Sequence, residues 1–246
     1  MDCEEIFAGE MVQGKPIPLL RSRLPKLSKS RFIAGYQCHK RLYLECYSRD
    51  LADPVTPALQ ASFDVGTRVG EIARNSYPGG RLIDLDHIHH QKAEELTMQA
   101  LKDPSVPSVY EAAFTYNDIR IRADIMARVG DDLFDLIEVK STGSFKSEYE
   151  MDVAIQLFVV EGCGLHIRNA YLLHVDRRKH SAHSSKVSFK LVDITETCRL
   201  LRPLVLKELD AMRRPLWLLA PPEISSGLHC RLPYVCPFTG HCSNGW

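Results

Sequence analysis

Residues 108–142 read SVYEAAFTYNDIRIRADIMARVGDDLFDLIEVKST, and this pattern predicts three short strands joined by tight turns. The stretch carries three carboxylates, Glu111, Asp124 and Glu138, and Lys140 follows the last of them by two residues. Side chains two apart on a strand share a face of the sheet. We therefore expect the side chains of Glu138 and Lys140 to point the same way.

The length of the second loop decides whether two of the carboxylates meet. Residues 130–132 (GDD) suit a three-residue hairpin loop. Counting outward from the middle residue of this loop places Asp124 opposite Glu138. A two-residue loop would instead set Asp124 opposite Ile137, on the wrong face.

The first hairpin adds a third acid to the row. A two-residue turn at 117–118 (ND) brings Glu111 opposite Asp124. Acids in a row beside a lysine predict a divalent-metal site with a cationic helper.

The alternative is ordinary solvated strand carboxylates, because an E-x-K triplet arises by chance in many proteins. However, residues 133–139 (LFDLIEV) are mostly apolar, as in a strand covered on both faces. Charges at the end of such a strand cost free energy unless they are paired or metal-bound, which favours the metal site.

Composition limits the class of protein. The chain has 246 residues, 45% hydrophobic and 25% charged, which suits one globular α/β domain with or without a small appendage. Lysine plus arginine and aspartate plus glutamate number 31 each, so any DNA contact would need local positive patches. No stretch approaches the roughly 20 apolar residues of a membrane span, and the acidic start MDCEEIFAGEM lacks a signal-peptide pattern. We expect a cytoplasmic protein without a membrane partner. In such a protein the eight cysteines indicate metal binding or redox chemistry more than disulfide bonds.

Helix and strand signals alternate along the rest of the chain. We expect a flexible arm over residues 1–27 and one domain over residues 28–246. The expected helices span 27–48, 57–76, 91–101, 147–161 and 193–212, and further strands span 81–85 and 169–175. A crossover from strand 133–140 through the helix to strand 169–175 implies a parallel pair. The predicted fold class is α/β, with a mixed central sheet flanked by helices.

Two polar clusters leave alternatives open. Lys40 and Arg41 suit either a solvated helix face or a phosphate contact. His87, His89 and His90 stand close together, but their spacing matches no zinc template with cysteines nearby. We interpret them as a solvated loop at a helix start.

The last informative stretch is residues 230–242, CRLPYVCPFTGHC. Its three cysteines follow a C-x5-C-x5-C spacing with proline and glycine between them, which suits a loop wrapped round a metal. Tetrahedral zinc and a cubane cluster usually take four ligands. Cys38 is the natural fourth if the chain ends meet, and Cys46 and His241 are the reserves. Three unrelated buried cysteines are the alternative, and softness of the ligands does not decide between zinc and iron–sulfur.

These features together resemble the PD-(D/E)xK nuclease superfamily. The resemblance is carried by Cys38 in SRFIAGYQCHKRLYL, by Asp124, by the E-V-K triplet at 138–140, by Gln156 and by the cysteine tail. More narrowly, the chain resembles the iron–sulfur branch, which includes RecB-type nuclease domains and CRISPR-associated RecB-like exonucleases, and a related bacterial family with the same cysteine tail. The match covers roughly residues 27–246, and it is the order and spacing of the motifs that are specific. It implies a restriction-endonuclease-like core whose N-terminal helix and C-terminal tail, about 225–246, are joined by a metal cluster.

The resemblance also implies roles for individual residues. Asp124 matches the first metal-binding aspartate, and Glu138 matches the second acid, with the Val139 carbonyl as a further ligand. Lys140 matches the lysine that orients or deprotonates the attacking water or stabilises developing charge. Gln156 matches the glutamine of the helix motif Q-x-x-x-Y. The iron–sulfur ligands implied are Cys38, Cys230, Cys236 and Cys242.

The sequence departs from the family pattern in two places. The tyrosine of Q-x-x-x-Y is Val160 here, which weakens any DNA-positioning role for that position. In VGTRVGEI, Gly70 stands where a metal-binding histidine is expected. Glu71 is therefore a candidate substitute ligand, together with Glu111 from the meander, and binding of a single metal is the alternative.

The function implied is a Mg²⁺- or Mn²⁺-dependent deoxyribonuclease acting on single-stranded DNA or DNA ends, with a structural [4Fe–4S] cluster or, alternatively, zinc. DNA is the expected partner, with protein partners in DNA repair or defence. A second class remains open, a DNA-binding or assembly module that does not cut. The candidate phosphate contacts, which carry no base information, are Arg31, Lys40, Arg41, Arg68, Arg74 and Arg122.

Overall fold

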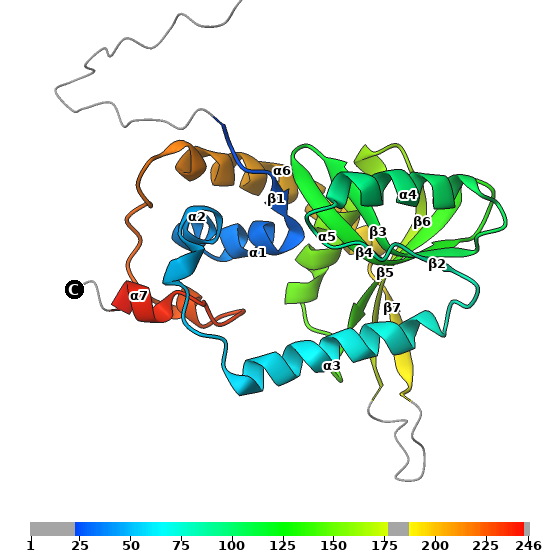
Figure 1. Cartoon of the computed structure of the whole chain (residues 1–246), viewed down its shortest axis with the longest axis horizontal. Coiled ribbons are helices and arrows are strands. Elements are labelled where there is room, and N and C mark those ends of the chain that lie inside the picture. Colours follow the sequence, from blue (N-terminus) through cyan, green and yellow to red (C-terminus); the bar gives the residue numbers. More distant parts are fainter. Residues whose placement is uncertain (1–22, 177–186, 244–246) are drawn as a thin grey trace, which may run out of the picture.

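A seven-stranded mixed sheet forms the centre of the computed structural model, which describes residues 23–176 and 187–243. Six strands follow the order β2-β3-β4-β5-β6-β7, and β1 pairs with β4 beside this path (Figure 1). The strands are β1 (Leu27–Ser28), β2 (Arg81–Leu82), β3 (Ser108–Tyr116), β4 (Ile119–Arg128), β5 (Leu133–Lys140), β6 (His166–Val175) and β7 (Phe189–Asp193). The predicted α/β class with a mixed sheet is confirmed.

The β3–β4–β5 meander has the predicted register. Both residues of the turn at 117–118 have positive φ angles, 49° and 61°, as in the tight turns that suit the twist of hairpins. In the second hairpin Ile125 pairs with Ile137, so Asp124 falls opposite Glu138. Counting residues was sufficient here because each loop is short enough to fix the pairing of its strands.

β5 is the central strand, and its residues 134–138 are buried. It is linked to β6 through α5 (Glu148–Gly162), and the two strands pair in parallel from Leu133↔His166 to Lys140↔His174. The predicted crossover is therefore confirmed. Along the chain the elements from residue 90 to residue 175 are therefore a helix, three strands, a helix and a strand.

α5 is buried more completely than an amphipathic surface helix would be. Residues 149 and 151–160 are all buried, so the helix is enclosed on every side rather than along one stripe. Two of these buried side chains, Asp152 and Gln156, are polar. Buried polar groups need partners, and theirs lie on β5.

The expected N-terminal helix is in fact two helices. α1 (Lys29–Gln37) and α2 (His39–Tyr47) are separated by Cys38, which has an extended backbone with φ −164° and ψ 122°. Both backbone groups of Cys38 are paired at the break, because its amide donates to the Ala34 carbonyl and its carbonyl accepts from Leu42. The prediction of a continuous helix was wrong at Cys38, next to residues that contact the C-terminal tail.

The other helices keep close to the sequence pattern, with one exception. They are α3 (Pro57–Arg74), α4 (His90–Lys102), α6 (Thr195–Trp217) and α7 (Thr239–Ser243), with single turns of 3-10 helix at Arg49–Leu51 and Leu228–Cys230. α6 continues past its expected end because Met212 and Leu216 remain buried. Strand β7 was not predicted, and β1 includes Leu27, which was assigned to the arm but is buried and paired with Ile119.

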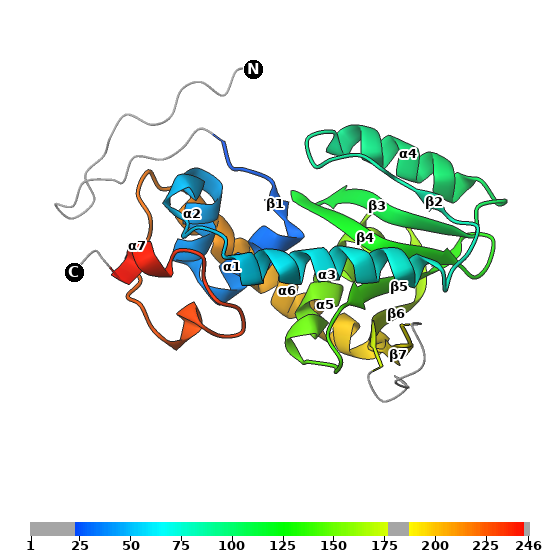
Figure 2. The ribbon, with the colours of Figure 1, turned by 60° about the horizontal axis from the view of Figure 1, so that its bottom comes forward.

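Helices cover both faces of the sheet. Figure 2 shows α4 on one side and α5 and α6 on the other, and α3 reaches the sheet with its C-terminal part. There, Ala73 packs in a small cluster with Ile125, Ile137 and Leu173. His87 and His89 are exposed, as expected of a solvated loop, but the expectation was wrong for His90, which opens α4 and is buried. None of the helices within the described ranges is long and apolar enough to cross a membrane.

The two ends of the described chain meet beside the sheet, where α1, α2, the end of α6 and the C-terminal tail pack together (Figure 1). The side-chain amide of Gln37 donates to the carbonyls of His229 and Tyr234, at 2.5 and 2.7 Å. The hydroxyl of Tyr47 donates to the Leu216 carbonyl at 2.8 Å. The tail is thus held against the N-terminal helices by protein contacts.

Candidate active site

The acids predicted to meet do lie side by side. Asp124 on β4 and Glu138 on β5 face the side of the sheet that α5 covers, and the Val139 amide donates to the Asp124 carboxylate at 2.7 Å. Glu138 is only 2% exposed. The backbone of the second acid motif therefore fixes the orientation of the first acid.

Glu138 is surrounded by donors. Its Oε1 lies 2.9 Å from Nζ of Lys140, and its Oε2 accepts from Nε2 of Gln156 at 2.7 Å. Nζ of Lys29, the first residue of α1, lies 2.8 Å from Oε1 and 2.9 Å from Oε2. Two ammonium groups and an amide thus converge on one buried carboxylate.

Lys140 is held from both sides. Its Nζ donates to Oδ2 of Asp152 at 2.6 Å and lies 5.0 Å from the centroid of the Tyr149 ring. Gln156 also donates to the Asp152 carbonyl at 2.9 Å, whereas its buried Oε1 has no hydrogen-bond partner within residues 23–176 and 187–243. Such an orphaned acceptor usually marks a missing water or ion.

The two acids titrate in opposite directions. Burial and the neighbouring Glu138 charge raise the pKa of Asp124 to about 7. Burial would also raise the pKa of Glu138, but the adjacent Lys140 and Lys29 ammonium groups hold it below the ordinary value. The pair thus carries an ionised acid and an acid that is partly protonated near neutral pH.

Both lysines remain protonated. Burial would lower their pKa values, but Glu138 and Asp152 raise the pKa of Lys140, and Glu138 and Asp124 raise that of Lys29. A general base needs a pKa near the working pH. Lys140 is therefore suited to donate hydrogen bonds and stabilise negative charge, and not to remove a proton.

The donor set fits a hard divalent cation. Two adjacent carboxylates offer the oxygen ligands that Mg²⁺ and Mn²⁺ prefer, and burial followed by the Glu138 charge raises the pKa of Asp124, an effect that a bound cation would oppose. Over residues 23–176 and 187–243, no three His, Cys, Asp or Glu side chains form a ready ligand set. A metal here would draw on Asp124, Glu138, the Val139 carbonyl and solvent.

Glu111 and Glu71 occupy a neighbouring hollow of about 490 Å³. Glu111 is in register with Asp124, but its φ of 55° is rare for a residue other than glycine, and it interrupts the β3–β4 ladder. Its carboxylate pairs with Arg74 at 3.0 Å, and its charge still contributes to the raised pKa of Asp124. Glu71 is exposed on α3. Glu111 therefore acts on Asp124 through its charge, whereas Glu71 is an exposed residue of the same hollow.

Most of the candidate phosphate contacts are engaged by the protein. Arg31 donates to the Glu45 carbonyl, and Arg74 pairs with Glu111. Arg122 donates to the carbonyls of Ile83, Glu111, Leu85 and Asp86. Lys40 and Arg41 line the cysteine cavity described next, whereas Arg68 is exposed on α3.

The four predicted cysteine ligands line one cavity. Cys38 contributes from the α1–α2 break, and Cys230, Cys236 and Cys242 contribute from the tail. All four are free thiols, and burial raises the pKa of Cys236 and Cys242. As for the acids, no three of these thiols form a ready ligand set within the described residues.

Arg41 brings a buried hydrogen-bond donor to this cavity. Its Nη1 donates to Gln37 at 2.7 Å, but its buried Nε has no partner among the residues that the structure describes. Burial lowers the pKa of Arg41, while the neighbouring Cys236 and Cys38 oppose that shift. A buried donor beside thiols fits a thiolate-ligated metal, whether zinc or iron–sulfur, because each leaves net negative charge on its sulfurs.

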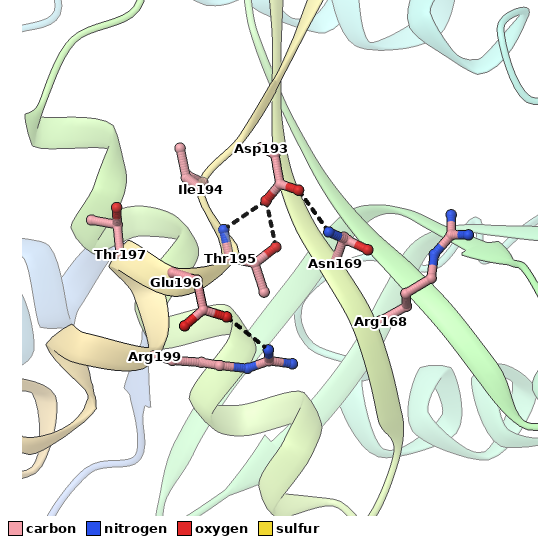
Figure 3. A pocket seen from close by; sticks show the side chains of 8 residues that line it. All are labelled: Arg168, Asn169, Asp193, Ile194, Thr195, Glu196, Thr197 and Arg199. Atoms are coloured by element: carbon pink, nitrogen blue, oxygen red, sulfur yellow. Dashed lines mark hydrogen bonds and ion pairs between the residues drawn. The ribbon is translucent and has the colours of Figure 1, made fainter.

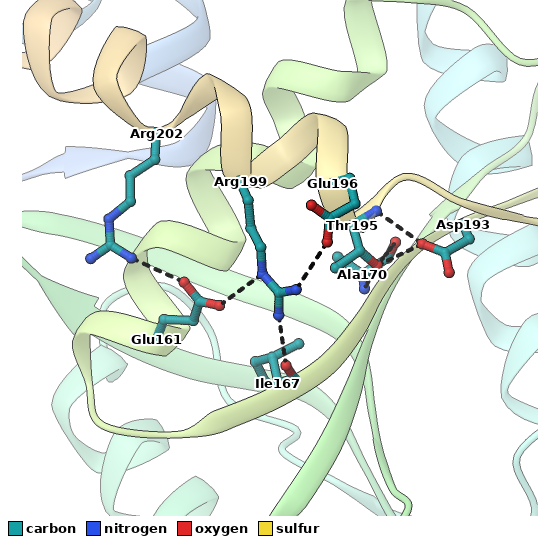
Figure 4. Close-up of polar contacts among 8 residues, drawn as sticks. All are labelled: Glu161, Ile167, Ala170, Asp193, Thr195, Glu196, Arg199 and Arg202. Atoms are coloured by element: carbon teal, nitrogen blue, oxygen red, sulfur yellow. Dashed lines mark hydrogen bonds and ion pairs between the residues drawn. The ribbon is translucent and has the colours of Figure 1, made fainter.

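A second hollow, of about 310 Å³ at the start of α6, is not a candidate site (Figure 3). Asp193 caps Thr195 through its amide and hydroxyl and accepts from Asn169. Arg199 is engaged by Glu196, by Glu161 and by the Ile167 carbonyl (Figure 4). The charged groups drawn there already satisfy one another.

Sequence reasoning missed three residues around the acids. No sequence pattern indicated the contact of Lys29 with Glu138, because a lysine at the start of a capped helix is common. Asp152 shares a helix face with Gln156 at i, i+4 spacing, a pattern visible in the sequence. Tyr234 lies near Asp152, and burial followed by the Asp152 charge raises its pKa. Only the folded tail brings it there.

The chain is similar in fold to two proteins of known structure. One is an alkaline exonuclease, LHK-Exo, from Laribacter hongkongensis: the match has 14% identity, covers 79% of this chain and 89% of that one, and has a TM-score of 0.42. A second structure of LHK-Exo, in complex with dAMP, matches with 14% identity, coverage of 79% and 91%, and a TM-score of 0.43. The other protein, SSO0001, matches with 12% identity, coverage of 76% and 75%, and a TM-score of 0.38. No protein-family model and no curated protein matches the chain. These likenesses are too distant to carry an argument about function.

Proposed function

We propose that this protein is a metal-dependent nuclease that hydrolyses phosphodiester bonds. The observation that supports it is the buried pair of Asp124 and Glu138 with the ammonium group of Lys140 alongside. Asp124, Glu138 and the Val139 carbonyl would hold Mg²⁺ or Mn²⁺. Such an ion, when bound, activates water and neutralises charge on the phosphate.

The protein side chains supply orientation and fixed charge. Asp152 holds the Lys140 ammonium at 2.6 Å, so the donor is preorganised before substrate arrives. The raised pKa of Lys140 keeps its ammonium group charged, which suits stabilisation of the extra negative charge on the phosphoryl oxygens. Gln156 orients Glu138 and adds no charge of its own.

The finer parts of the proposal come from the family resemblance. Single-stranded DNA or DNA ends are the expected substrate, with exonuclease action as the mode. Protein partners in DNA repair or defence, and a cytoplasmic location, belong to the same proposal, since thiolate metal ligands need a reducing compartment. The four cysteines would hold a [4Fe–4S] cluster, or zinc, whose role is to join α2 to the tail and not to carry electrons.

One observation favours a second candidate, a module that binds DNA without cutting it. Both oxygens of Glu138 are already occupied by protein donors. If no metal displaces them, the acids form only a structural ion-pair network. The two candidates differ in whether the protein degrades DNA when Mg²⁺ or Mn²⁺ is added.

The deciding experiment is degradation of end-labelled single-stranded DNA by anaerobically purified protein. We expect Mn²⁺- or Mg²⁺-dependent cleavage that falls by about 100-fold or more in Asp124→Asn and in Lys140→Ala. The matched control is Asp135→Asn, which removes a buried carboxylate from β5, the strand that carries Glu138 and Lys140; Asp135 pairs with Arg168 at 2.6 Å instead of with the acid pair. Equal activity in Asp124→Asn and wild type, with both folded by circular dichroism, would refute the proposal.

A further inference from the structure

Lys29 makes an unusual contact for a residue that opens a helix. It is 109 residues from Glu138 in sequence, yet its Nζ lies within 2.8 and 2.9 Å of both carboxylate oxygens. This places a cation symmetrically across the carboxylate that the proposed function assigns to a metal. The side chain of Lys29 is 24% exposed, whereas that of Glu138 is 3% exposed.

The backbone beneath Lys29 is held firmly. Leu27 and Ser28 form β1 and pair with Ile119 and Arg120 of β4. The Ser28 hydroxyl caps α1 by accepting from the Arg31 amide at 3.2 Å. Any movement of the ammonium group therefore comes from the flexible four-carbon stem of the lysine and not from the helix.

Glu138 has no acceptor position to spare. An ionised carboxylate accepts about four hydrogen bonds. Lys29 and Lys140 occupy Oε1, and Lys29 and Gln156 occupy Oε2. A divalent cation that binds Glu138 has to displace one of these three donors.

Lys29 is the donor that can leave. Lys140 is also tied to Asp152 at 2.6 Å, and the Gln156 amide is also tied to the Asp152 carbonyl at 2.9 Å. Among the described residues, Nζ of Lys29 has no hydrogen-bond acceptor other than Glu138. Its partial exposure gives it a route to solvent that the buried Gln156 does not have.

We propose that Lys29 is a built-in cation that competes with the divalent metal for Glu138. In the metal-free protein the ammonium group holds the acid in place, and metal binding expels it from both oxygens. Lys29 thereby sets the metal concentration at which the site fills. The inference rests on the metal site of the proposed function, but it concerns binding and not catalysis.

Manganese binding to the DNA-free, full-length protein tests it, with free Mn²⁺ measured by electron paramagnetic resonance. Lys29→Met removes the competing charge while keeping the stem, and we expect Mn²⁺ to bind about tenfold more tightly, as for loss of a charge-assisted hydrogen bond. Lys29→Arg replaces the ammonium group with a planar fork that matches a carboxylate, and we expect weaker Mn²⁺ binding. The two substitutions thus shift affinity in opposite directions.

The matched control is Lys146→Met. Lys146 carries the same charge near the start of α5, but it lies 3.7 Å from Glu148, is 48% exposed and does not contact Glu138. We expect the Mn²⁺ affinity of Lys146→Met to stay within about twofold of wild type, because exposed charges are screened by solvent.

The possible outcomes separate this inference from the proposed function. Equal Mn²⁺ affinity in wild type and Lys29→Met, or weaker affinity in Lys29→Met, overturns the role of Lys29 and leaves the metal site standing. No Mn²⁺ binding in either protein overturns the metal site and the inference together. If Lys29→Met does not fold, Lys29→Arg still decides, since unchanged or tighter binding by that variant contradicts competition.

Discussion

The acid site and the cysteine cavity are both candidate metal centres, but the chain builds them in opposite ways. The acids come from one hairpin, β4–β5, whose register a short loop fixes. The cysteines come from Cys38 and from the tail at the other end of the described chain. The acid site is a local product of strand pairing, whereas the cavity exists only once the chain ends have met.

Their charge balance differs as well. The acid pair already has Lys29 and Lys140 as counter-charges, so it is tolerable without metal. The cysteine cavity packs thiols with Leu44 and Phe238 in a small hydrophobic cluster. We infer that losing the metal costs mainly activity at the acid site and mainly stability at the cysteine site, because metal binding and folding are coupled where the ligands come from distant segments.

The largest expected effect breaks the cysteine side of this comparison. Cys236→Ser should abolish the bound iron or zinc and lower Tm by about 10 °C or more, since structural metal sites contribute directly to folding. Metal analysis and thermal unfolding on the same anaerobic sample measure both quantities. Cys163→Ser is the control, because Cys163 lies away from the cavity and donates to the Thr115 carbonyl. If wild-type protein that contains no metal has the same Tm as wild-type protein that contains metal, then the tail needs no metal.

The acid side of the comparison could be predicted further than the cysteine side. Loop lengths of two and three residues fixed which carboxylates meet, and no long-range information was needed. The contact of Lys29 was out of reach, because it depends on Leu27 and Ser28 joining β4 as an extra parallel strand. The sequence does not encode that pairing in any local pattern.

For the cysteine site, the sequence predicted the ligands but not the local structure that presents them. The spacing in the tail indicated a metal loop, and Cys38 was the natural fourth ligand, yet the break between α1 and α2 was not foreseen. Propensity favours one continuous helix there, and tertiary context overrides it at Cys38. The shared face of Asp152 and Gln156 on α5 was visible in the sequence, but its burial against β5 was not, because that depends on the partners Lys140 and Glu138.

A pH series sharpens the electrostatic half of the comparison. The pKa of Asp124 is raised to about 7, and a metal ligand has to be deprotonated. We expect the apparent Mn²⁺ affinity to rise by up to about tenfold per pH unit below pH 7 and to level off above it. The stability of the metal-free protein changes with pH in the opposite direction. Because the pKa of Asp124 is higher in the folded protein than in the unfolded chain, the free energy of unfolding of the metal-free protein falls as the pH rises from about 4 to about 7.

Titration calorimetry in two buffers of different ionisation enthalpy checks the proton release. Below pH 7 we expect close to one proton released per Mn²⁺ bound, and above pH 8 close to none. We expect Asp124→Asn, which removes both the titrating group and a metal ligand, to show neither Mn²⁺ binding nor proton release. A flat affinity between pH 5.5 and 7 in wild type would contradict the raised pKa of Asp124.

The smallest expected effect concerns Glu111, which separates a direct ligand from a neighbouring charge. Its carboxylate pairs with Arg74, is 38% exposed, and influences Asp124 only through its charge. We expect Glu111→Gln to change Mn²⁺ affinity by less than about tenfold, because a partly exposed charge is screened. Arg74→Gln is the matched variant, since it frees the Glu111 carboxylate without removing it, and we expect slightly tighter Mn²⁺ binding. If Glu111→Gln instead abolishes binding as Asp124→Asn does, then Glu111 is a direct ligand, and its strained φ of 55° is the conformation that delivers a third oxygen to the ion.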